Sequence, residues 1–332
     1  MKYSIAIAIG TAYCVLSSVQ SFSQDDLSRG SSTYPTKPVR IIVPFPPGQT
    51  VDLVGRMISE RLTQAFDKTF VVDNRAGASG TLGTSFAAKS PADGYTLLVV
   101  SNGTLAGNAA IYKEKLPYNP NRDFAPIINF ITTPQLLIAN VNFQPKTVRE
   151  LVNYAKANPG KISYATPGYG TSSHLAMEML RAQAGIDLVM VPYQGSPAAF
   201  TDIIAGRIPI MFEAAMAIIG QIRAGKVRAV ATGGARRAGF LPDLPTISES
   251  GYPGFDATPW VGLVAPAGTP KDLLTKIHDE TLKALVAPGA KERILELGAE
   301  PSGMNPDQFA TLIRSEIERW TKVVQTAGIK LE

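Results

Sequence analysis

Two glycine-rich segments hold the residues of this sequence whose types and spacing best suit the binding of a small molecule. The segments PFPPGQTVD (44–52) and ATPGYGTSSHLA (165–176) each follow an apolar run and precede an expected helix. The first N–H groups of a helix have no partner within it, and with the helix dipole they bind anions without a cationic side chain. We therefore expect the two segments to close on one small carboxylate.

The first segment is stiffened by its prolines, and Gly48 can adopt a positive φ. We expect the N–H groups of Gly48, Gln49 and Thr50 to face the carboxylate, with Phe45 as an apolar wall. Thr50 or Asp52 can cap the helix. We expect Asp52 to be a cap or a hinge support rather than a ligand contact, because a carboxylate beside a bound carboxylate is repelled. An ordinary strand-to-helix connection is the alternative interpretation.

The second segment is richer in glycine and hydroxyl groups. Gly168 and Gly170 allow close approach of the backbone, and Thr166, Thr171 and Ser172 offer hydroxyls and N–H groups just before a helix. This density makes the segment the stronger anion site of the two. A plain turn is the alternative.

Four further residues follow apolar strands and are expected near the same cleft. Ligands of open parallel sheets collect beyond the carboxyl ends of the strands, which is where Ser101, Asn102, Tyr193 and Glu213 are expected to lie. Glu213 could accept a hydrogen bond from an amino or hydroxyl group of the ligand, or it could pair with a basic residue.

Motifs of catalysis are absent from the sequence: it contains no G-x-S-x-G, P-loop, S-x-x-K or H-E-x-x-H pattern. His174 adjoins Ser172 and could contact a ligand or act as a base, but we expect it to support the loop. The single cysteine, Cys14, lies in the expected signal peptide, and no cofactor or metal site is predicted. An exported hydrolase using Ser172 and His174 is the alternative, and it lacks an orienting acid.

The N-terminus predicts export. Residues 1–23 combine Lys2 with a mostly apolar run and small residues before the expected cleavage, which is typical of a signal peptide, and 24–33 form a polar leader. A membrane anchor is the alternative, but the run is shorter than the ~20 apolar residues of a spanning helix. An exported chain without disulfides favours the periplasm. The modest net charge of +5 and the lack of basic runs argue against nucleic acid as a partner.

Alternating apolar strands and amphipathic helices predict an α/β fold whose first part, βαβαβ, forms a parallel sheet. The first helix is expected at 50–66, and a second series of strands and helices begins near 162. We predict a discontinuous lobe 1, 31–131 plus 252–332, and an inserted lobe 2, 132–251. A simple division near 145 is the alternative.

The order of these segments resembles the Bug-type extracytoplasmic solute-binding receptors of the tripartite tricarboxylate transporters. The matching stretches include YPTKPVRIIVPFPPG (34–48), SPADGYTLL (90–98), SYATPGYGTSSHLA (163–176), VPYQGSPAAFTDIIAGRI (191–208) and WVGLVAPAGTP (260–270). The resemblance implies a type II periplasmic-binding-protein fold, with a ligand cleft between two lobes joined by a hinge, and no catalysis. It also implies a small carboxylate ligand, membrane permease subunits as partners and a monomer.

By position, the resemblance implies that the ligand contacts are Phe45, Gly48, Gln49, Thr50, Ser101 or Asn102, Thr166, Gly170, Thr171, Ser172, His174 and Tyr193. Gln49 and Glu213 depart from the usual glycine and aspartate of the family, which predicts a smaller or differently substituted ligand. Dicarboxylates, amino acids and aromatic acids all stay open; Phe45, Tyr193 and Trp260 could stack on an aromatic ring or simply pack. A receptor that feeds a sensor is the alternative to transport.

Overall fold

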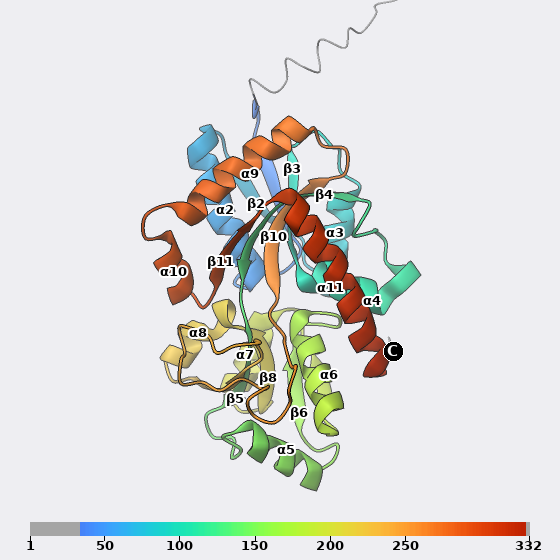
Figure 1. Ribbon diagram of the computed structural model, residues 1–332, viewed down its shortest axis with the longest axis vertical. Helices are drawn as coiled ribbons and strands as arrows, with labels where there is room; N and C mark the ends of the chain where they lie inside the picture. Colours follow the sequence, from blue (N-terminus) through green and yellow to red (C-terminus); the bar gives the residue numbers. More distant parts are fainter. Residues whose placement is uncertain (1–33, 330–332) are drawn as a thin grey trace, which may run out of the picture. The chain divides into compact units, whose positions relative to one another are not determined.

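The structure is a computed structural model that describes residues 34–329, and the chain from Pro35 onward forms one compact unit. The predicted signal peptide (1–23) and leader (24–33) lie outside the described residues. Two separate β-sheets organise the unit (Figure 1). We call the six-stranded sheet with its helices lobe 1 and the five-stranded sheet with its helices lobe 2.

Lobe 1 has the strand order β11-β4-β10-β3-β1-β2. Its strands are β1 (Val39–Val43), β2 (Phe70–Asn74), β3 (Thr96–Ser101), β4 (Phe124–Thr132), β10 (Trp260–Pro266) and β11 (Glu300–Met304). Its helices are α2 (Thr50–Phe66), α3 (Thr81–Ala88), α4 (Asn108–Tyr112), α9 (Lys271–Val286), α10 (Ala290–Glu296) and α11 (Pro306–Thr326). Helix α2 packs with α9, while α3 and α11 share an apolar cluster with the sheet.

Lobe 2 has the strand order β7-β6-β8-β5-β9. Its strands are β5 (Gln135–Asn140), β6 (Ser163–Thr166), β7 (Val189–Pro192), β8 (Ile210–Ala214) and β9 (Val227–Thr232). Its helices are α5 (Val148–Ala157), α6 (Ser172–Ala184), α7 (Ser196–Ile204) and α8 (Ala215–Arg223). Helices α5 and α6 bury their apolar residues in one cluster and α7 and α8 in another.

The chain crosses between the sheets twice, and the two crossings run side by side. The first leaves β4 at Thr132 and enters β5 at Gln135; the second leads from β9 to β10. Backbone hydrogen bonds join them, from Thr133 N–H to the Pro259 carbonyl (3.0 Å) and from Gln135 N–H to the Ala257 carbonyl (3.0 Å). The sequence-based lobe borders, 31–131 plus 252–332 and 132–251, stay a prediction.

The bounds of helix α2 were predicted correctly from the sequence. Its bounds, Thr50–Phe66, are those expected, because Val51, Val54, Ile58 and Leu62 recur on one face and all are buried. Its start follows β1 directly, so its N-terminus lies at the carboxyl edge of the lobe 1 sheet.

Two details of local structure could not be read from the sequence pattern. The lobe 1 sheet is mixed, because β10 runs antiparallel to both β3 and β4 although β1, β2 and β3 are parallel as expected. The N-cap of α7 is Gly195, with φ of 104°. The sequence favours Ser196 at this position, because serine side chains commonly cap helices, but Ser196 is fully buried in the first turn. A glycine at this position allows a backbone conformation that serine adopts only with strain.

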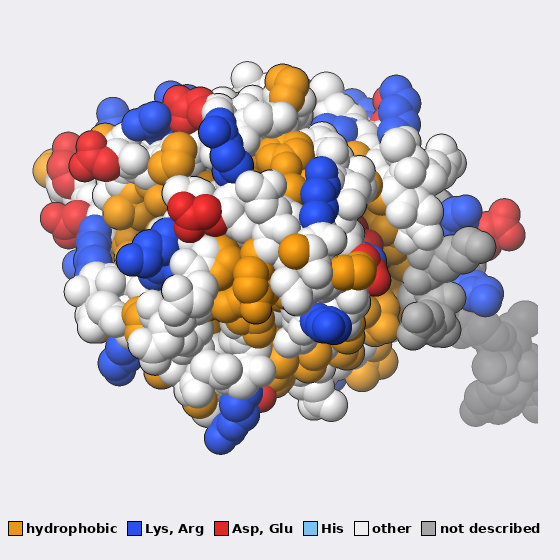
Figure 2. Space-filling view, turned by 90° about the horizontal axis from the view of Figure 1, so that it is seen from below, with side chains coloured by type: hydrophobic (Ala, Val, Ile, Leu, Met, Phe, Trp, Pro, Cys, Tyr) orange, Lys and Arg blue, Asp and Glu red, His pale blue; other side chains and the backbone are white. Residues whose placement is uncertain are grey.

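Residues 34–329 contain no helix with the length and apolar character that crossing a membrane requires. Seen from below, the surface carries lysine and arginine side chains scattered among neutral and apolar ones (Figure 2). On this face they form no continuous basic band.

Candidate functional site

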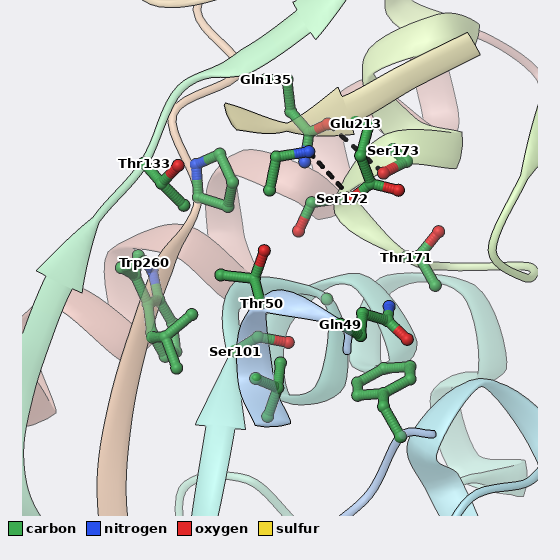
Figure 3. A pocket seen from close by; sticks show the side chains of 16 residues that line it. Gln49, Thr50, Ser101, Thr133, Gln135, Thr171, Ser172, Ser173, Glu213 and Trp260 are labelled. Atoms are coloured by element: carbon green, nitrogen blue, oxygen red, sulfur yellow. Dashed lines mark hydrogen bonds between the residues drawn. The ribbon is translucent and has the colours of Figure 1, made fainter. Parts of the chain in front are cut away.

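A small pocket lies where the N-termini of α2 and α6 meet, one helix from each lobe (Figure 3). Its volume is about 40 Å³. Both helix starts, the ends of β3 and β8, and both crossings contribute to its walls. The lining residues are Phe45, Gln49, Thr50, Val51, Ser101, Gly103, Thr133, Gln135, Thr171, Ser172, Ser173, Glu213, Ala214, Pro259, Trp260 and Val261.

On the α2 side of the pocket, Asp52 holds the loop before the helix through hydrogen bonds. Its Oδ2 accepts the Gly48 N–H (2.9 Å) and pairs with Arg56 (3.0 Å), and its Oδ1 accepts from Asn74 (2.9 Å). Burial alone would raise the pKa of Asp52, but the bonds from Arg56, Gly48 and Asn74 outweigh it and hold the pKa below its ordinary value. The Gly48 N–H is thus engaged within its own loop, and Thr50 and Val51 are the first helical residues at the pocket.

The α6 side has a matching arrangement. Thr171 is the N-cap, and its Oγ1 accepts the N–H of His174 (3.3 Å). Ser172 and Ser173 follow as the first two helical residues, and Ser173 Oγ donates to Gln135 Oε1 (3.3 Å). Because the first N–H groups of a helix have no carbonyl partner within it, the positive ends of two helices face the same pocket.

His174 stabilises the loop before α6 from the side that faces away from the pocket lining. Its Nδ1 accepts the N–H of Gly170 (3.1 Å), and its ring packs edge-on against Tyr169, with 5.6 Å between ring centroids. The side chain does not line the pocket, and burial lowers its pKa to about 4. His174 is therefore neutral near pH 7 and available as a hydrogen-bond acceptor.

This burial predicts an acid-sensitive contribution to stability. As the pH drops from 6.5 towards about 4, the unfolded histidine takes up a proton that the folded one does not. The free energy of unfolding should therefore fall over that range, by up to about 3 kcal/mol. In His174→Gln the amide oxygen can still accept from Gly170 but does not titrate. Denaturant unfolding at pH 7 and pH 4.5 should show a smaller loss in the variant; parallel losses would contradict the assignment.

Polar atoms without partners gather at the pocket. Among the described residues, Gln49 Oε1, Thr50 Oγ1, Trp260 Nε1 and Glu213 Oε2 are buried and meet no partner with hydrogen-bond geometry. Buried polar groups in native proteins are nearly always satisfied. Four such atoms around one cavity indicate that a polar molecule completes it.

Glu213 is the most unusual of these groups. It is the penultimate residue of β8, with 2% of its surface exposed, and its Oε1 accepts the N–H of Ala214 (2.9 Å). Burial raises its pKa to about 7, against a smaller opposing effect of the nearby Ser196 hydroxyl and the Ala214 N–H. In Figure 3 it lies on the lobe 2 side of the pocket, with Gln135, Ser172 and Ser173.

The residues singled out in the sequence fall into three groups. Phe45, Gln49, Thr50, Ser101, Thr171, Ser172 and Glu213 line the pocket. Gly168 and Tyr193 line a neighbouring groove that shares Phe45, and the Tyr193 hydroxyl donates to Asp202 (2.6 Å). Gly48, Asn102, Thr166, Gly170 and His174 are part of neither wall.

The members of this third group hold the loops instead. Asn102 is fully buried, donates to Glu316 on α11 and accepts from Ser172 Oγ (3.3 Å) across the lobes. Thr166 Oγ1 donates to the Gly168 carbonyl (3.1 Å). Whether any of the singled-out residues touches a ligand stays a prediction.

Sequence reasoning missed the walls that the crossings supply. Thr133, Gln135 and Pro259 lie in or beside the two connections, and Trp260 begins β10. Trp260 was considered only as a stacking or packing residue; it packs edge-on against Phe309 at 5.1 Å and presents its buried Nε1 to the pocket. The available signal was the pair of polar residues Thr133 and Gln135, which stand between two apolar strand runs.

The sequence matches a family described as tripartite tricarboxylate transporter family receptor over residues 54–329. The chain belongs to this family. The resemblance to Bug-type receptors is confirmed by BugT of Bordetella pertussis, which is 34% identical over 302 residues, covering 91% of this chain and 93% of BugT. Members of the family are periplasmic solute-binding proteins, and this receptor has their two-lobed fold.

Two solved structures with ligands are similar to the receptor. R. palustris Rpa4515 with adipate has a TM-score of 0.87 and 35% identity, covering 90% of this chain and 99% of that one. MatC (Rpa3494) of Rhodopseudomonas palustris with bound malate has a TM-score of 0.83 and 31% identity, covering 88% and 100%. Both ligands are dicarboxylates.

Proposed function

We propose that this chain captures a small organic carboxylate in the pocket between the N-termini of α2 and α6. The observation that carries the proposal is the meeting of two helix N-termini at a pocket whose lining, among the described residues, includes no lysine, arginine or histidine. Such ends stabilise a carboxylate through N–H donors and the helix dipoles. The adipate and malate of the similar structures support this ligand class.

Capture would end with closure of the lobes. Ser172 of lobe 2 already bonds to Asn102 of lobe 1, and Pro46 lies close to Gly195 across the same gap. Closure excludes water and so strengthens charge-assisted hydrogen bonds to the ligand. We further propose that the chain acts as a monomer in the periplasm and delivers its ligand to membrane permease subunits, as the family and the sequence of residues 1–23 favour.

The hydrolase alternative gains no support from the histidine. Nδ1 of His174 accepts the Gly170 N–H, so this nitrogen is not free to take a proton from Ser172. A general base must lie within hydrogen-bond reach of the group it activates.

A thermal-shift screen of residues 24–332 against mono-, di- and tricarboxylates, aromatic acids and amino acids tests the proposal. A ligand that binds only the folded state raises the unfolding midpoint by mass action. We expect a rise with at least one acid, and none with the corresponding uncharged amide. If no acid raises the midpoint, and mass spectrometry of the denatured protein finds no co-purified acid, the proposal is wrong.

A further inference from the structure

The described residues that line the pocket include one acidic side chain and no basic one. Among the described residues that line it, Glu213 is the only one with an ionisable side chain. A carboxylate ligand would therefore bring a second negative charge into the same small pocket. Keeping two carboxylates ionised in one small pocket costs free energy, because each negative charge raises the pKa of the other group.

Among the described residues, no neighbouring element supplies a cation to Glu213. On α6 the only titratable neighbour at the loop, His174, is neutral and turned to Gly170. On α2, Asp52 is already paired with Arg56 outside the pocket lining. The described pocket residues Gln135, Ser172, Ser173, Thr50 and Trp260 are uncharged. Leu136 of β5 and Ser196 of α7, which lie beside Glu213 outside the pocket lining, are uncharged too.

The Oε2 atom of Glu213 can act either as a hydrogen-bond acceptor or, when it is protonated, as a donor. Oε1 is occupied by the Ala214 N–H, whereas Oε2 is buried without a partner of hydrogen-bond geometry. An ionised carboxylate only accepts hydrogen bonds, but a protonated one also donates. A proton on Oε2 would remove the repulsion between Glu213 and the ligand carboxylate, and its O–H group could donate a hydrogen bond to the ligand.

We propose that Glu213 is protonated whenever a carboxylate occupies the pocket, so that the receptor takes up one proton from solvent with its ligand and Glu213 favours ligands that can accept its hydrogen bond. This inference rests on the proposed function and adds a specificity-determining residue to it. In the empty protein the acid is half-titrated near neutrality, since the pKa of Glu213 lies at about 7. Uptake is thus measurable at ordinary pH.

The sign of the pH dependence follows. Below pH 6 Glu213 is already protonated in the empty protein and adds no pH dependence to binding. Above pH 7 it is mostly ionised, so each binding event must take up a proton from solvent, where protons become scarcer as the pH rises. With the pKa at about 7, the affinity for a carboxylate should fall about tenfold between pH 6 and pH 8.

Isothermal titration calorimetry at pH 6, 7 and 8 tests this, with malate, adipate and the ammonium-bearing 4-aminobutyrate as probes alongside the acids from the thermal-shift screen. Each titration is repeated in two buffers of different ionisation enthalpy, which counts the protons exchanged. We expect close to one proton taken up at pH 8 and a tenfold loss of affinity. Glu213→Gln should bind with no proton exchange and no pH dependence, whereas Glu292→Gln, at an exposed acid on α10, should behave as the unchanged protein.

The other outcomes are decisive too. Binding without proton uptake would overturn this inference and leave the proposed function standing. Proton release, with binding restricted to ammonium-bearing acids, would also overturn it, because Glu213 would then pair with a cation on the ligand. Failure of every acid to bind at any pH would overturn both.

Discussion

Replacing Thr50 by proline should weaken ligand binding on the order of 10- to 100-fold while leaving the fold intact. Thr50 is the first residue of α2, where proline is well tolerated because the N–H has no partner within the helix. Gln49 before it has φ −83° and ψ 156°, an extended conformation that a following proline favours. The change removes one N–H donor from the pocket and nothing from the helix ladder.

Thr50→Val is the matched control for this variant. It removes the hydroxyl, which has no partner in the described structure, and keeps the N–H and the shape of the side chain. Calorimetric titration of both variants, with circular dichroism to check the fold, should show a much larger loss for proline than for valine. Equal losses would mean that the hydroxyl or the local shape, and not the backbone, holds the ligand.

Gly107→Ala should hold the lobes apart. Gly107 precedes α4 in lobe 1 with ordinary helical angles, φ −62° and ψ −50°, so alanine costs nothing in the backbone. A Cβ there would lie 2.2 Å from the Gly170 carbonyl oxygen of the α6 loop and 2.9 Å from Leu175. Both contacts belong to lobe 2, and separation of the lobes relieves them. If closure becomes a minority state, affinity should fall about tenfold or more.

Small-angle X-ray scattering with saturating acid measures the closure directly. The variant should keep a larger radius of gyration than the unchanged protein under the same conditions. Gly220→Ala is the control, because this helical glycine of α8 has no atom within 4 Å of an added Cβ. A compact, tightly binding Gly107→Ala protein would show that this contact does not limit closure.

The sequence predicted most elements of the fold because their signals are local. The stripe of apolar residues on α2 and the glycines before α6 are read over one or two helical turns, and the bounds at Thr50 and Ser172 agree with the structure. The direction of β10 was not predictable in this way. It pairs with β3 and β4, which lie far from it in the chain, and only their packing fixes its orientation.

In the candidate site, too, the features set by local sequence patterns were predicted and those set by tertiary contacts were not. The helix starts that hold Thr50 and Ser172 were expected from local patterns. The part played by Gly48 and Gly170 was not, because each N–H is engaged by a side chain four residues further on, Asp52 and His174. The pocket wall at Gln135 and Trp260 depends on two crossings that meet only in the folded chain.

The most direct test of the account is a crystal structure of the protein with the acid that gives the largest thermal shift. We predict the ligand carboxylate within hydrogen-bond distance of backbone N–H groups at the starts of both α2 and α6, at Thr50 or Val51 and at Ser172 or Ser173. A ligand seated in the groove beside Tyr193, or one that meets neither helix start, would contradict the account.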